Sequence, residues 1–381
     1  MQIVGIFLVF SFIFHYNSRK KQSSKKGASI LKHYDIAIVG GGPAGATFAR
    51  TIAISCPKMK IVLINGLPKT GSKVCGGLLA PDAQKVLAQF NLSLPKSILA
   101  DPQIFDVKTM DLGMGFHRSY QRHYLNMDRG KFDAWLLSLI PDNVEIIEGK
   151  CLSIDPGFLL HIQTKAGNLQ LSSQYLVGAD GGHSVVRRTF FAPPKKQYVA
   201  IQEYFSDIYA HIPHYSCIFD RATSDSCSWT IRKDGYWIFG GAFDVENCRQ
   251  AFDAQRSHLE TYLCIKLGPA IKREACLLTS IRSAKDLILG KERVFLIGEA
   301  AGFVSPSSFE GFSSAFLTGK HLADAFATST DADLILRYYR RKTRKLRVKL
   351  LCKIAKMKIL YTPLLRKMIM KSGICSIQKY Q

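Results

Sequence analysis

The sequence predicts a doubly wound α/β domain that carries an inserted, mainly antiparallel β-sheet domain and ends in a C-terminal helical region. The first observation is an apolar run at 36–39, which meets a cluster of glycines and then an alanine-rich helix start. That order is the opening of a βαβ unit. Two later apolar runs end in an acid-plus-glycine turn, at Asp180-Gly181 and at Gly298-Glu299. Strands that each end in such a turn are typical of one sheet with a ligand at its edge.

The first glycine turn leads into Pro43 and Ala44 and has the spacing G-x-G-x-x-G at Gly40, Gly42 and Gly45. Gly40 allows the sharp turn, Gly42 lets a pyrophosphate approach the backbone, and Gly45 lets the helix pack closely on the strand. The N–H groups at the helix start then face the anion. The turn therefore predicts a dinucleotide site, but it does not distinguish FAD from NAD(P).

The second predicted strand, 61–64, ends at Asn65. An acidic residue usually stands there and binds a ribose hydroxyl. An asparagine can still form this hydrogen bond, but without charge assistance. The βαβ motif of this chain therefore differs from the usual dinucleotide-binding pattern at this position.

The two later turns are rich in small residues, with Gly181 after Asp180 and with Ala300 and Gly302 after Glu299. Small residues permit close approach to a phosphate or a ribityl chain. We therefore expect one long ligand to cross the sheet and to contact all three turns.

The order of these three motifs resembles that of the FAD-dependent oxidoreductases of the aromatic-hydroxylase and geranylgeranyl-reductase type. Further segments resemble a bacterial, geranylgeranyl-reductase-like member of this family, and the resemblance runs from about residue 32 to the C-terminus. These segments are 73–84, 198–202, 215–220, 233–243 and 295–303. The resemblance implies an enzyme with a Rossmann-like fold that binds FAD and not NAD.

Domain boundaries follow from the places of these motifs. We expect an N-terminal extension, a discontinuous FAD-binding domain, a substrate domain and basic amphipathic C-terminal helices. Their ranges are 1–31 for the extension; 32–80, 125–189 and 286–330 for the FAD-binding domain; 81–124 and 190–285 for the substrate domain; and 331–381 for the helices.

The resemblance also implies roles for single residues. The first glycine turn would hold the pyrophosphate of FAD, and Asn65 would face the adenosine ribose. Arg129 matches the arginine of the family's R-x-x-F-D-x-W-L segment and would lie near the flavin. Asp180 would lie by the phosphates. Glu299 replaces the family's usual aspartate on the ribityl side and is longer by one methylene.

The segment Cys75-Gly76-Gly77 resembles the C-G-G motif of geranylgeranyl reductases. In that family the cysteine lies close to the flavin and to the substrate double bond. Reduction of an isolated C=C bond needs a hydride at one carbon and a proton at the other, and a positioned thiol can take part in proton delivery. Cys75 is therefore the candidate catalytic residue. The alternative is a small buried residue beside a glycine turn.

The stretch 235–243 reads as a strand with alternating aromatic residues. A related segment lines the lipid pocket of the reductases, so the resemblance implies that Trp237 and Phe239 line the substrate pocket together with Gly76 and Gly77. Ordinary β-sheet core is the alternative for each aromatic residue. No metal site is predicted.

These motifs together predict an FAD-dependent reductase of C=C bonds in an isoprenoid or other lipid-like substrate. A flavin-dependent monooxygenase and a membrane-associated flavoprotein without turnover are the alternatives. The sequence holds no second G-x-G-x-x-G motif. The reductant is therefore expected to be NAD(P)H that binds transiently, or a protein electron donor.

The net charge of +23 is concentrated at the two ends of the chain. Residues 1–32 and 334–381 hold 21 of the 52 basic residues and no acidic residue, so the rest of the chain is almost neutral. This distribution indicates an anionic surface, and not nucleic acid, as the partner. The apolar stretch 3–14 is too short to span a bilayer. It is either a weak membrane anchor or an appendage without a structural role.

The last fifty residues predict a basic amphipathic helix. Apolar side chains recur at steps of three or four residues with lysines between them, at Leu346, Leu350, Ile354, Met357, Leu364 and Met368. Such a helix suits an anionic bilayer surface, and the alternative is a helix that docks on the body.

Ten cysteines without a C-x-x-C pair indicate reduced thiols. We therefore expect a cytoplasmic protein that is peripheral on the inner face of the cell membrane.

Overall fold

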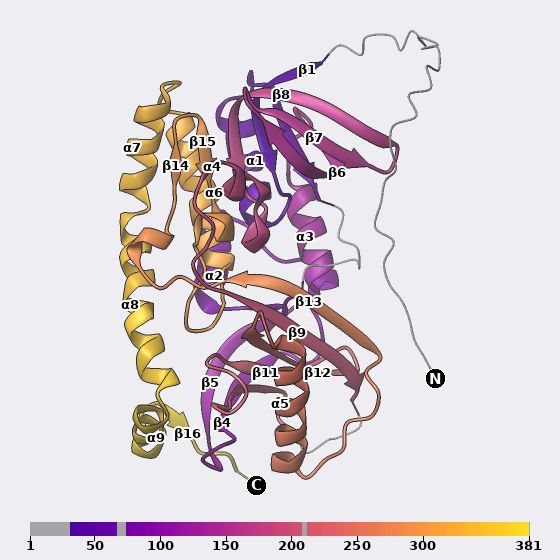
Figure 1. The fold of residues 1–381 in the computed structure, drawn as a ribbon, viewed down its shortest axis with the longest axis vertical. Helices are drawn as coiled ribbons and strands as arrows, with labels where there is room; N and C mark the ends of the chain where they lie inside the picture. Colours follow the sequence, from indigo (N-terminus) through magenta and orange to yellow (C-terminus); the bar gives the residue numbers. More distant parts are fainter. Residues whose placement is uncertain (1–30, 67–73, 208–211, 381) are drawn as a thin grey trace, which may run out of the picture. The chain divides into compact units, whose positions relative to one another are not determined.

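A computed structural model of the chain describes residues 31–66, 74–207 and 212–380. Residues 32–381 form one compact unit, and the predicted N-terminal extension lies outside the described residues apart from Leu31. The unit contains a seven-stranded sheet and a nine-stranded sheet with helices on both (Figure 1).

The seven-stranded sheet is built around the predicted βαβ unit. Its parallel strands stand in the order β6, β2, β1, β8, β15, which is the doubly wound arrangement. Antiparallel β7 joins β6 to β8, and β14 pairs with β15. The bounds are β1 Lys32–Val39, β2 Ile61–Asn65, β6 Val144–Asp155, β7 Leu159–Thr164, β8 Gly167–Gly178, β14 Gly290–Lys291 and β15 Val294–Leu296. The central strands are buried, as expected for a sheet that is covered on both faces.

Two long helices, α1 (Pro43–Ser55) and α6 (Phe312–Phe326), pack directly on each other beside this sheet. Gly319 permits the close approach, because a Cβ atom there would lie 2.6 Å from the Ala44 carbonyl oxygen. The shorter elements nearby are α2 Pro81–Gln89, η1 Lys96–Ile98, α3 Arg129–Ser138, η2 Gly181–His183, α4 Val185–Phe190, η3 Ala284–Asp286 and η4 Gly298–Ala301.

The nine-stranded sheet is antiparallel except for the parallel pair β4–β10, as predicted for the second domain. Its order is β13, β9, β12, β11, β10, β4, β5, β16, and β3 pairs with β5. Helix α5 (Cys248–Leu263) covers one face over an apolar core. The bounds are β3 Leu78–Leu79, β4 Ile104–Asp111, β5 Phe116–Asn126, β9 Gln197–Ser206, β10 Tyr215–Phe219, β11 Ser228–Lys233, β12 Tyr236–Asp244, β13 Lys272–Thr279 and β16 Ser376–Ile377.

Helix α2 does not pack in the domain that was predicted for its residues. The sequence places 81–124 in the predicted substrate domain, but α2 packs on α6. Its buried residues Ala83, Val86 and Leu87 belong to the same core as β1 and α1. The physical reason is that the apolar face of α2 has its partner on the FAD-binding side. The chain therefore enters the nine-stranded sheet only at β4, apart from the short pairing of β3.

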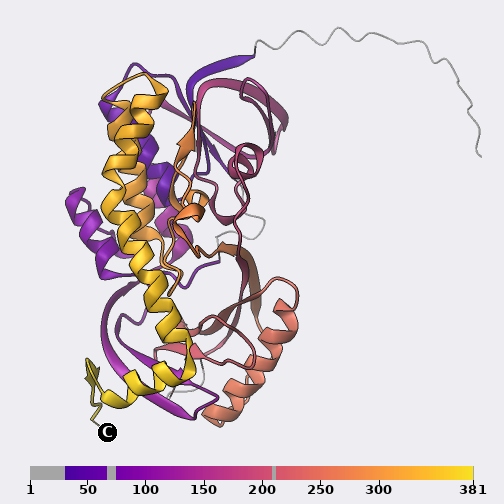
Figure 2. The ribbon, with the colours of Figure 1, turned by 60° about the vertical axis from the view of Figure 1, so that its left-hand side comes forward.

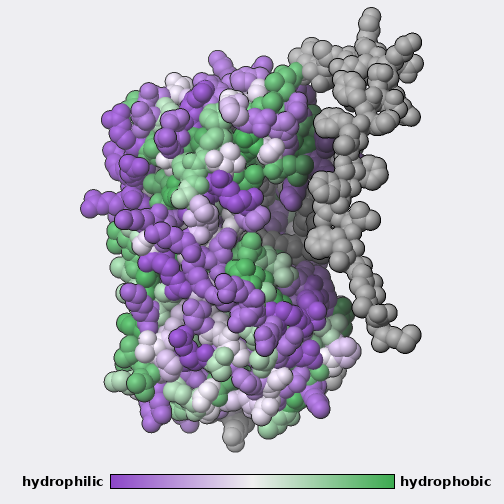
Figure 3. All heavy atoms as spheres, viewed as in Figure 1, coloured by the Kyte–Doolittle hydropathy of each residue, from purple (hydrophilic) through white to green (hydrophobic). Residues whose placement is uncertain are grey.

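Three C-terminal helices run along one side of both sheets: α7 (Ala332–Lys342), α8 (Arg344–Tyr361) and α9 (Pro363–Ser372) (Figure 2). Leu346, Leu350 and Met357 of α8 are buried, so α8 docks on the body. Of the two alternatives that the sequence leaves open, docking on the body therefore holds for α8. Figure 3 shows apolar side chains at the lower left edge, where Figure 1 places the end of α8 and α9. Within the described ranges, no helix has the length and the apolar composition needed to cross a bilayer.

Candidate active site

The turn between β1 and α1 leaves open space where a ligand can approach. Gly40 has φ +111°, and a Cβ atom there would lie 2.4 Å from the Ala179 carbonyl oxygen. A Cβ atom on Gly45 would lie 1.9 Å from the Gly40 carbonyl oxygen, so this glycine is needed for packing. A Cβ atom on Gly42 would meet nothing within 4 Å. Gly42 is also the N-cap residue of α1 and forms no side-chain cap, and the first turn of the helix is therefore open to an anion.

Asn65, at the end of β2, lies against this same turn. A Cβ atom on Gly41 would lie 2.3 Å from the Asn65 Oδ1 atom. The side chain is therefore in the place where the motif usually has an acidic residue. Its contact with a ribose stays a prediction.

The turn after β8 contains a carboxylate oxygen without a partner. Asp180 Oδ2 accepts hydrogen bonds from the Val185 N–H at 2.6 Å and from the Val186 N–H at 3.4 Å. The Oδ1 atom is buried and has no hydrogen-bond partner among the described residues. Burial raises the pKa of Asp180, although hydrogen bonds from Ser184 and the backbone counteract part of this effect. A buried polar atom without a partner is costly, so Oδ1 is a candidate for a ligand contact.

The turn after β15 is fixed to the other two turns. Gly298 has φ +58°, and a Cβ atom there would lie 2.8 Å from the Ala44 Cβ atom. The Glu299 Oε1 atom accepts a hydrogen bond from the Thr279 N–H at 3.0 Å and lies against Gly182. Glu299 thus binds this turn to β13, and its contact with a ribityl chain stays a prediction.

Small residues around Glu299 make this close packing possible. Gly302 has φ +86°, and a Cβ atom there would lie 2.7 Å from the Asp286 carbonyl oxygen. Ala300 is buried, and its carbonyl oxygen accepts a hydrogen bond from Arg187 Nη1 at 3.0 Å. Because β1, β8 and β15 are parallel neighbours, the three predicted turns meet at the carboxyl edge of the sheet.

Cys75 lies in a segment that contacts β11 and the start of α3. A Cβ atom on Gly76 would lie 2.6 Å from Ile231 Cδ1 on β11. Gly77 has φ +65°, and its carbonyl oxygen accepts a hydrogen bond from the Met127 N–H at 2.9 Å. The Cys75 Sγ atom accepts a hydrogen bond from the Gly77 N–H at 3.4 Å. The C-G-G segment is therefore held against the nine-stranded sheet on the face opposite to α5.

Arg129, the first residue of α3, provides one cation near Cys75. Its Nε atom donates to Asp133 Oδ1 at 2.9 Å, and its guanidinium lies 4.9 Å from the centre of the Phe312 ring. Burial lowers the pKa of Arg129, but the Asp133 carboxylate and the Cys75 side chain outweigh burial and raise it above the usual value. Arg129 thus connects Cys75 to the start of α6, and its place near the flavin stays a prediction.

Lys233 provides a second cation, which the sequence analysis missed. Its Nζ atom donates to the Gly76 and Met127 carbonyl oxygens, each at 2.7 Å. Burial lowers the pKa of Lys233 to about 8, although the Cys75, Asp128 and Asp234 side chains counteract part of this effect. Nothing in the local sequence indicates this role, because the lysine stands next to a hairpin turn where exposed lysines are ordinary.

Trp237 and Phe239 do not lie on the Cys75 side of the sheet. Trp237 packs on Phe205 at 6.2 Å and Phe239 packs on Phe252 of α5 at 5.0 Å, measured between ring centres. Both are 1% exposed or less and belong to the core under α5. Their prediction as pocket residues is wrong, because side chains alternate along β12 and these two point to the opposite face.

The Cys75 side of the sheet presents a polar network instead. The Tyr204 hydroxyl donates to Glu274 Oε2 at 2.8 Å and accepts from Gln202 Nε2 at 2.7 Å. The Tyr204 ring contacts Tyr236 at 5.9 Å between ring centres. Burial raises the pKa of Tyr204, as do Glu274 and, to a smaller extent, Cys75. Tyr204, Tyr236 and Lys233 are therefore candidates for the surface that faces a substrate.

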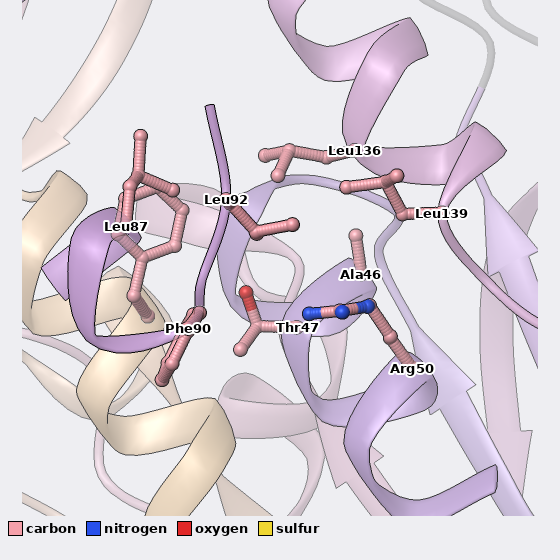
Figure 4. Close-up of a pocket in the computed structure, with 9 residues that line it drawn as sticks. Ala46, Thr47, Arg50, Leu87, Phe90, Leu92, Leu136 and Leu139 are labelled. Carbon is pink, nitrogen blue, oxygen red and sulfur yellow. The ribbon is translucent and has the colours of Figure 1, made fainter. Parts of the chain in front are cut away.

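Two cavities lie outside this group of residues. The first has about 10 Å³, enough for a single water molecule and too small for a substrate (Figure 4). It is lined by Ala46, Thr47, Arg50, Leu87, Phe90, Leu92, Leu136, Leu139 and Phe316. The second, of about 500 Å³, lies between β4, β5 and the C-terminal residues 377–380. Cys75 lines neither cavity.

Comparisons with known proteins identify the family. Residues 160–351 match the FAD binding domain family. The chain is 41% identical over 356 residues to Protein CbrA of Escherichia coli O6:H1 (strain CFT073), and the match covers 91% of this chain and 95% of that protein. The chain belongs to the CbrA family of FAD-binding proteins. The predicted resemblance to a geranylgeranyl-reductase-like bacterial protein is therefore confirmed at the level of the CbrA family.

Two solved structures have the fold of this CbrA family member. One is a geranylgeranyl bacteriochlorophyll reductase-like protein from Thermoplasma acidophilum, with a TM-score of 0.74 and 17% identity, covering 88% of this chain and 90% of that one. The other is p-nitrophenol 4-monooxygenase from Pseudomonas putida DLL-E4, with a TM-score of 0.68 and 16% identity, covering 90% and 94%. The predicted fold class is thus confirmed, since reductase-like and monooxygenase structures both have it.

The residues at the three turns fit FAD. The open space beside Gly42 accommodates a pyrophosphate, and the buried Asp180 Oδ1 atom is an acceptor without a partner among the described residues. Gly42, Asn65, Asp180 and Glu299 come from turns that the sheet brings together, so one extended cofactor can reach them all.

Proposed function

We propose that this CbrA family member uses FAD to reduce a C=C bond of an isoprenoid or other lipid-like substrate. The observation that carries the proposal is the place of the C-G-G segment. Its Gly76 carbonyl oxygen accepts a hydrogen bond from Lys233 Nζ at 2.7 Å, and its Cys75 side chain interacts with the Arg129 guanidinium. The similarity in fold to a geranylgeranyl bacteriochlorophyll reductase-like protein supports it. The C-G-G motif supports the same class of reaction.

Reduced FAD, held at the turns that contain Gly42, Asp180 and Glu299, would supply the hydride for one carbon of the double bond. The Cys75 thiol gives its proton to the other carbon, so the π bond is replaced by two C–H bonds. The thiolate that remains lies beside the Arg129 guanidinium and the Lys233 ammonium. A proton from water restores the thiol. The two electrons come from outside the chain, from NAD(P)H or from a protein electron donor.

The substrate surface in this proposal comes from the Cys75 side of the nine-stranded sheet. Tyr236 is 40% exposed and contacts Tyr204, so two aromatic rings lie on this face. Aromatic rings bind apolar chains through contact area, while the Tyr204 hydroxyl is already held by Glu274 and Gln202. These residues take the part that the sequence analysis gave to Trp237 and Phe239.

Anaerobic flavin spectroscopy tests this proposal. The holoprotein is reduced with dithionite in the absence of oxygen, and a geranylgeranyl lipid is then added. We expect the absorbance of oxidised flavin to return, and we expect no return with the fully saturated phytanyl lipid. If polyprenyl lipids leave the flavin reduced and turnover requires oxygen, the protein is a monooxygenase and the proposal is overturned.

A further inference from the structure

We infer that the outer face of α9 docks on an anionic lipid bilayer surface. This inference concerns an interaction surface and is independent of the proposed reaction. It assigns the contact to α9 and removes α8 from it, because the structure buries the apolar residues of α8 that the sequence pattern pointed to.

The outer face of α9 is apolar and exposed. Leu364 is 74% exposed, Met368 68%, Leu365 42% and Ile369 39%. At 3.6 residues per turn these four side chains fall within an arc of about 140°. Scattered exposed apolar residues are normal on a protein surface, but a contiguous strip on one helix marks an interaction site.

The inner face of α9 is fixed to the nine-stranded sheet by a buried ion pair. Arg366 and Asp111 are each 3% exposed, and both Nε, at 2.7 Å, and Nη2 of Arg366 donate to Asp111 Oδ2. The Met370 carbonyl oxygen accepts from Arg118 Nε at 3.0 Å. Because Arg366 and Met370 hold one side of the helix, the side with Leu364 and Met368 faces outward.

The charge around this strip favours an anionic lipid surface over a second copy of the chain. Residues 334–381 carry fifteen basic and no acidic residues. Lys367 and Lys371 lie beside one edge of the apolar arc, and both are exposed. Among the residues that the structure describes, no carboxylate pairs with either lysine, whereas Lys349 and Lys379 do have such partners. Two such faces would repel each other, whereas an anionic headgroup layer attracts the lysines and takes up the apolar side chains.

Vesicle co-sedimentation of the full-length holoprotein tests this inference. Vesicles of phosphatidylcholine mixed with phosphatidylglycerol are compared with vesicles of phosphatidylcholine alone. We expect binding to the anionic vesicles only, and weaker binding as the salt concentration rises. The variant L364E/M368E should bind at least about tenfold more weakly, because it removes two apolar contacts and adds two negative charges.

The matched control is I54E/F105E. Ile54 is 61% exposed and Phe105 is 71% exposed, and both lie outside α9. This control makes the same change in charge and should bind the vesicles nearly as well as the wild type. Unchanged binding of L364E/M368E, or an equal loss in both variants, would overturn the inference. The wild type could instead form a dimer and bind no vesicles, with the dimer dissociating in L364E/M368E. That result would identify a second copy of the chain as the partner and would also overturn the inference.

Discussion

Lys233 occupies the space that a side chain on Gly77 would need. A Cβ atom on Gly77 would lie 2.1 Å from the Lys233 Nζ atom, and this same nitrogen donates to the carbonyl oxygens of Gly76 and Met127. The ammonium therefore joins three parts of the chain that are far apart in sequence. It also places a positive charge beside Cys75, where the proposed reaction leaves a thiolate.

Replacing Cys75 with serine tests whether the thiol is catalytic. Serine keeps the size of the side chain but is a far weaker acid, so FAD content and melting temperature should stay nearly unchanged. Flavin reduction by the donor should persist, because it precedes protonation of the substrate. Product formation should fall by about 10²- to 10⁴-fold. Unchanged turnover would refute the role, and loss of FAD together with activity would favour a packing role.

The protonation of Lys233 should shape the pH dependence of the reaction. Lys233 has a pKa of about 8, so the side chain is an ammonium below this pH and a neutral amine above it. Product formation should therefore fall as the pH rises through about 8, because the thiolate loses one of its two neighbouring charges. The variant Lys233→Met should be slower than the wild type below about pH 8 and should lack this decline. The same decline in the variant would assign it to another group.

Lys233 should also affect stability in a way that depends on pH. Its pKa is lowered from 10.5 in the unfolded chain to about 8 in the folded protein, so the unfolded state binds the proton more tightly. The folded state gains stability relative to Lys233→Met as the pH rises from about 8 to 10.5, and this gain is absent below pH 8. Urea unfolding of both proteins across this range measures the difference. A difference that does not change with pH would show that the amine is not held in the described contacts.

Substitution of Gly42 should abolish FAD binding, whereas substitution of Gly45 should destabilise the fold. Valine at Gly42 has free space within 4 Å of its Cβ atom, so the fold should remain while FAD binding is lost. Alanine at Gly45 would place its Cβ atom 1.9 Å from the Gly40 carbonyl oxygen, so the fold itself should be destabilised. Flavin content and melting temperature of Gly42→Val and Gly45→Ala separate the two effects. FAD retained in Gly42→Val would contradict the assigned pyrophosphate position.

Removing one partner of the buried Arg366–Asp111 ion pair should lower the free energy of unfolding. Arg366→Met leaves a carboxylate that is 3% exposed without its partner, and we expect a loss of about 3 to 5 kcal/mol. The double variant Arg366→Met/Asp111→Leu should recover much of that loss, because no buried charge remains. Chemical denaturation of the single and double variants measures both values. Equal loss in the two would show that packing, and not the charge, is responsible.

The parts of the fold that follow from short-range pattern could be predicted. The glycine turn at 40–45 and the apolar runs before Asp180 and Glu299 each specify a strand followed by a turn, and parallel pairing then brings the turns together. Asn65 was singled out in the same way, through its place at the end of a strand, whereas Arg129 was singled out by its match to a family segment.

Residues whose roles depend on distant partners could not be predicted in this way. The partners of Lys233 are 157 and 106 residues away in sequence. Trp237 and Phe239 were assigned to the wrong face, because alternation along β12 shows that two faces exist but not which one meets α5. The sequence pattern correctly predicted that α8 has an apolar face, but this face packs on the body of the protein.

Mass spectrometry of the product tests the central claim most directly. The dithionite-reduced holoprotein is incubated anaerobically with a geranylgeranyl lipid, and the extracted lipid is compared with that from a Cys75→Ser reaction. Our account predicts a lipid that gains two hydrogens for each reduced double bond, with far less of it in the Cys75→Ser reaction. A lipid of unchanged mass under these conditions, together with a gain of one oxygen atom when air and NAD(P)H are supplied, would contradict it.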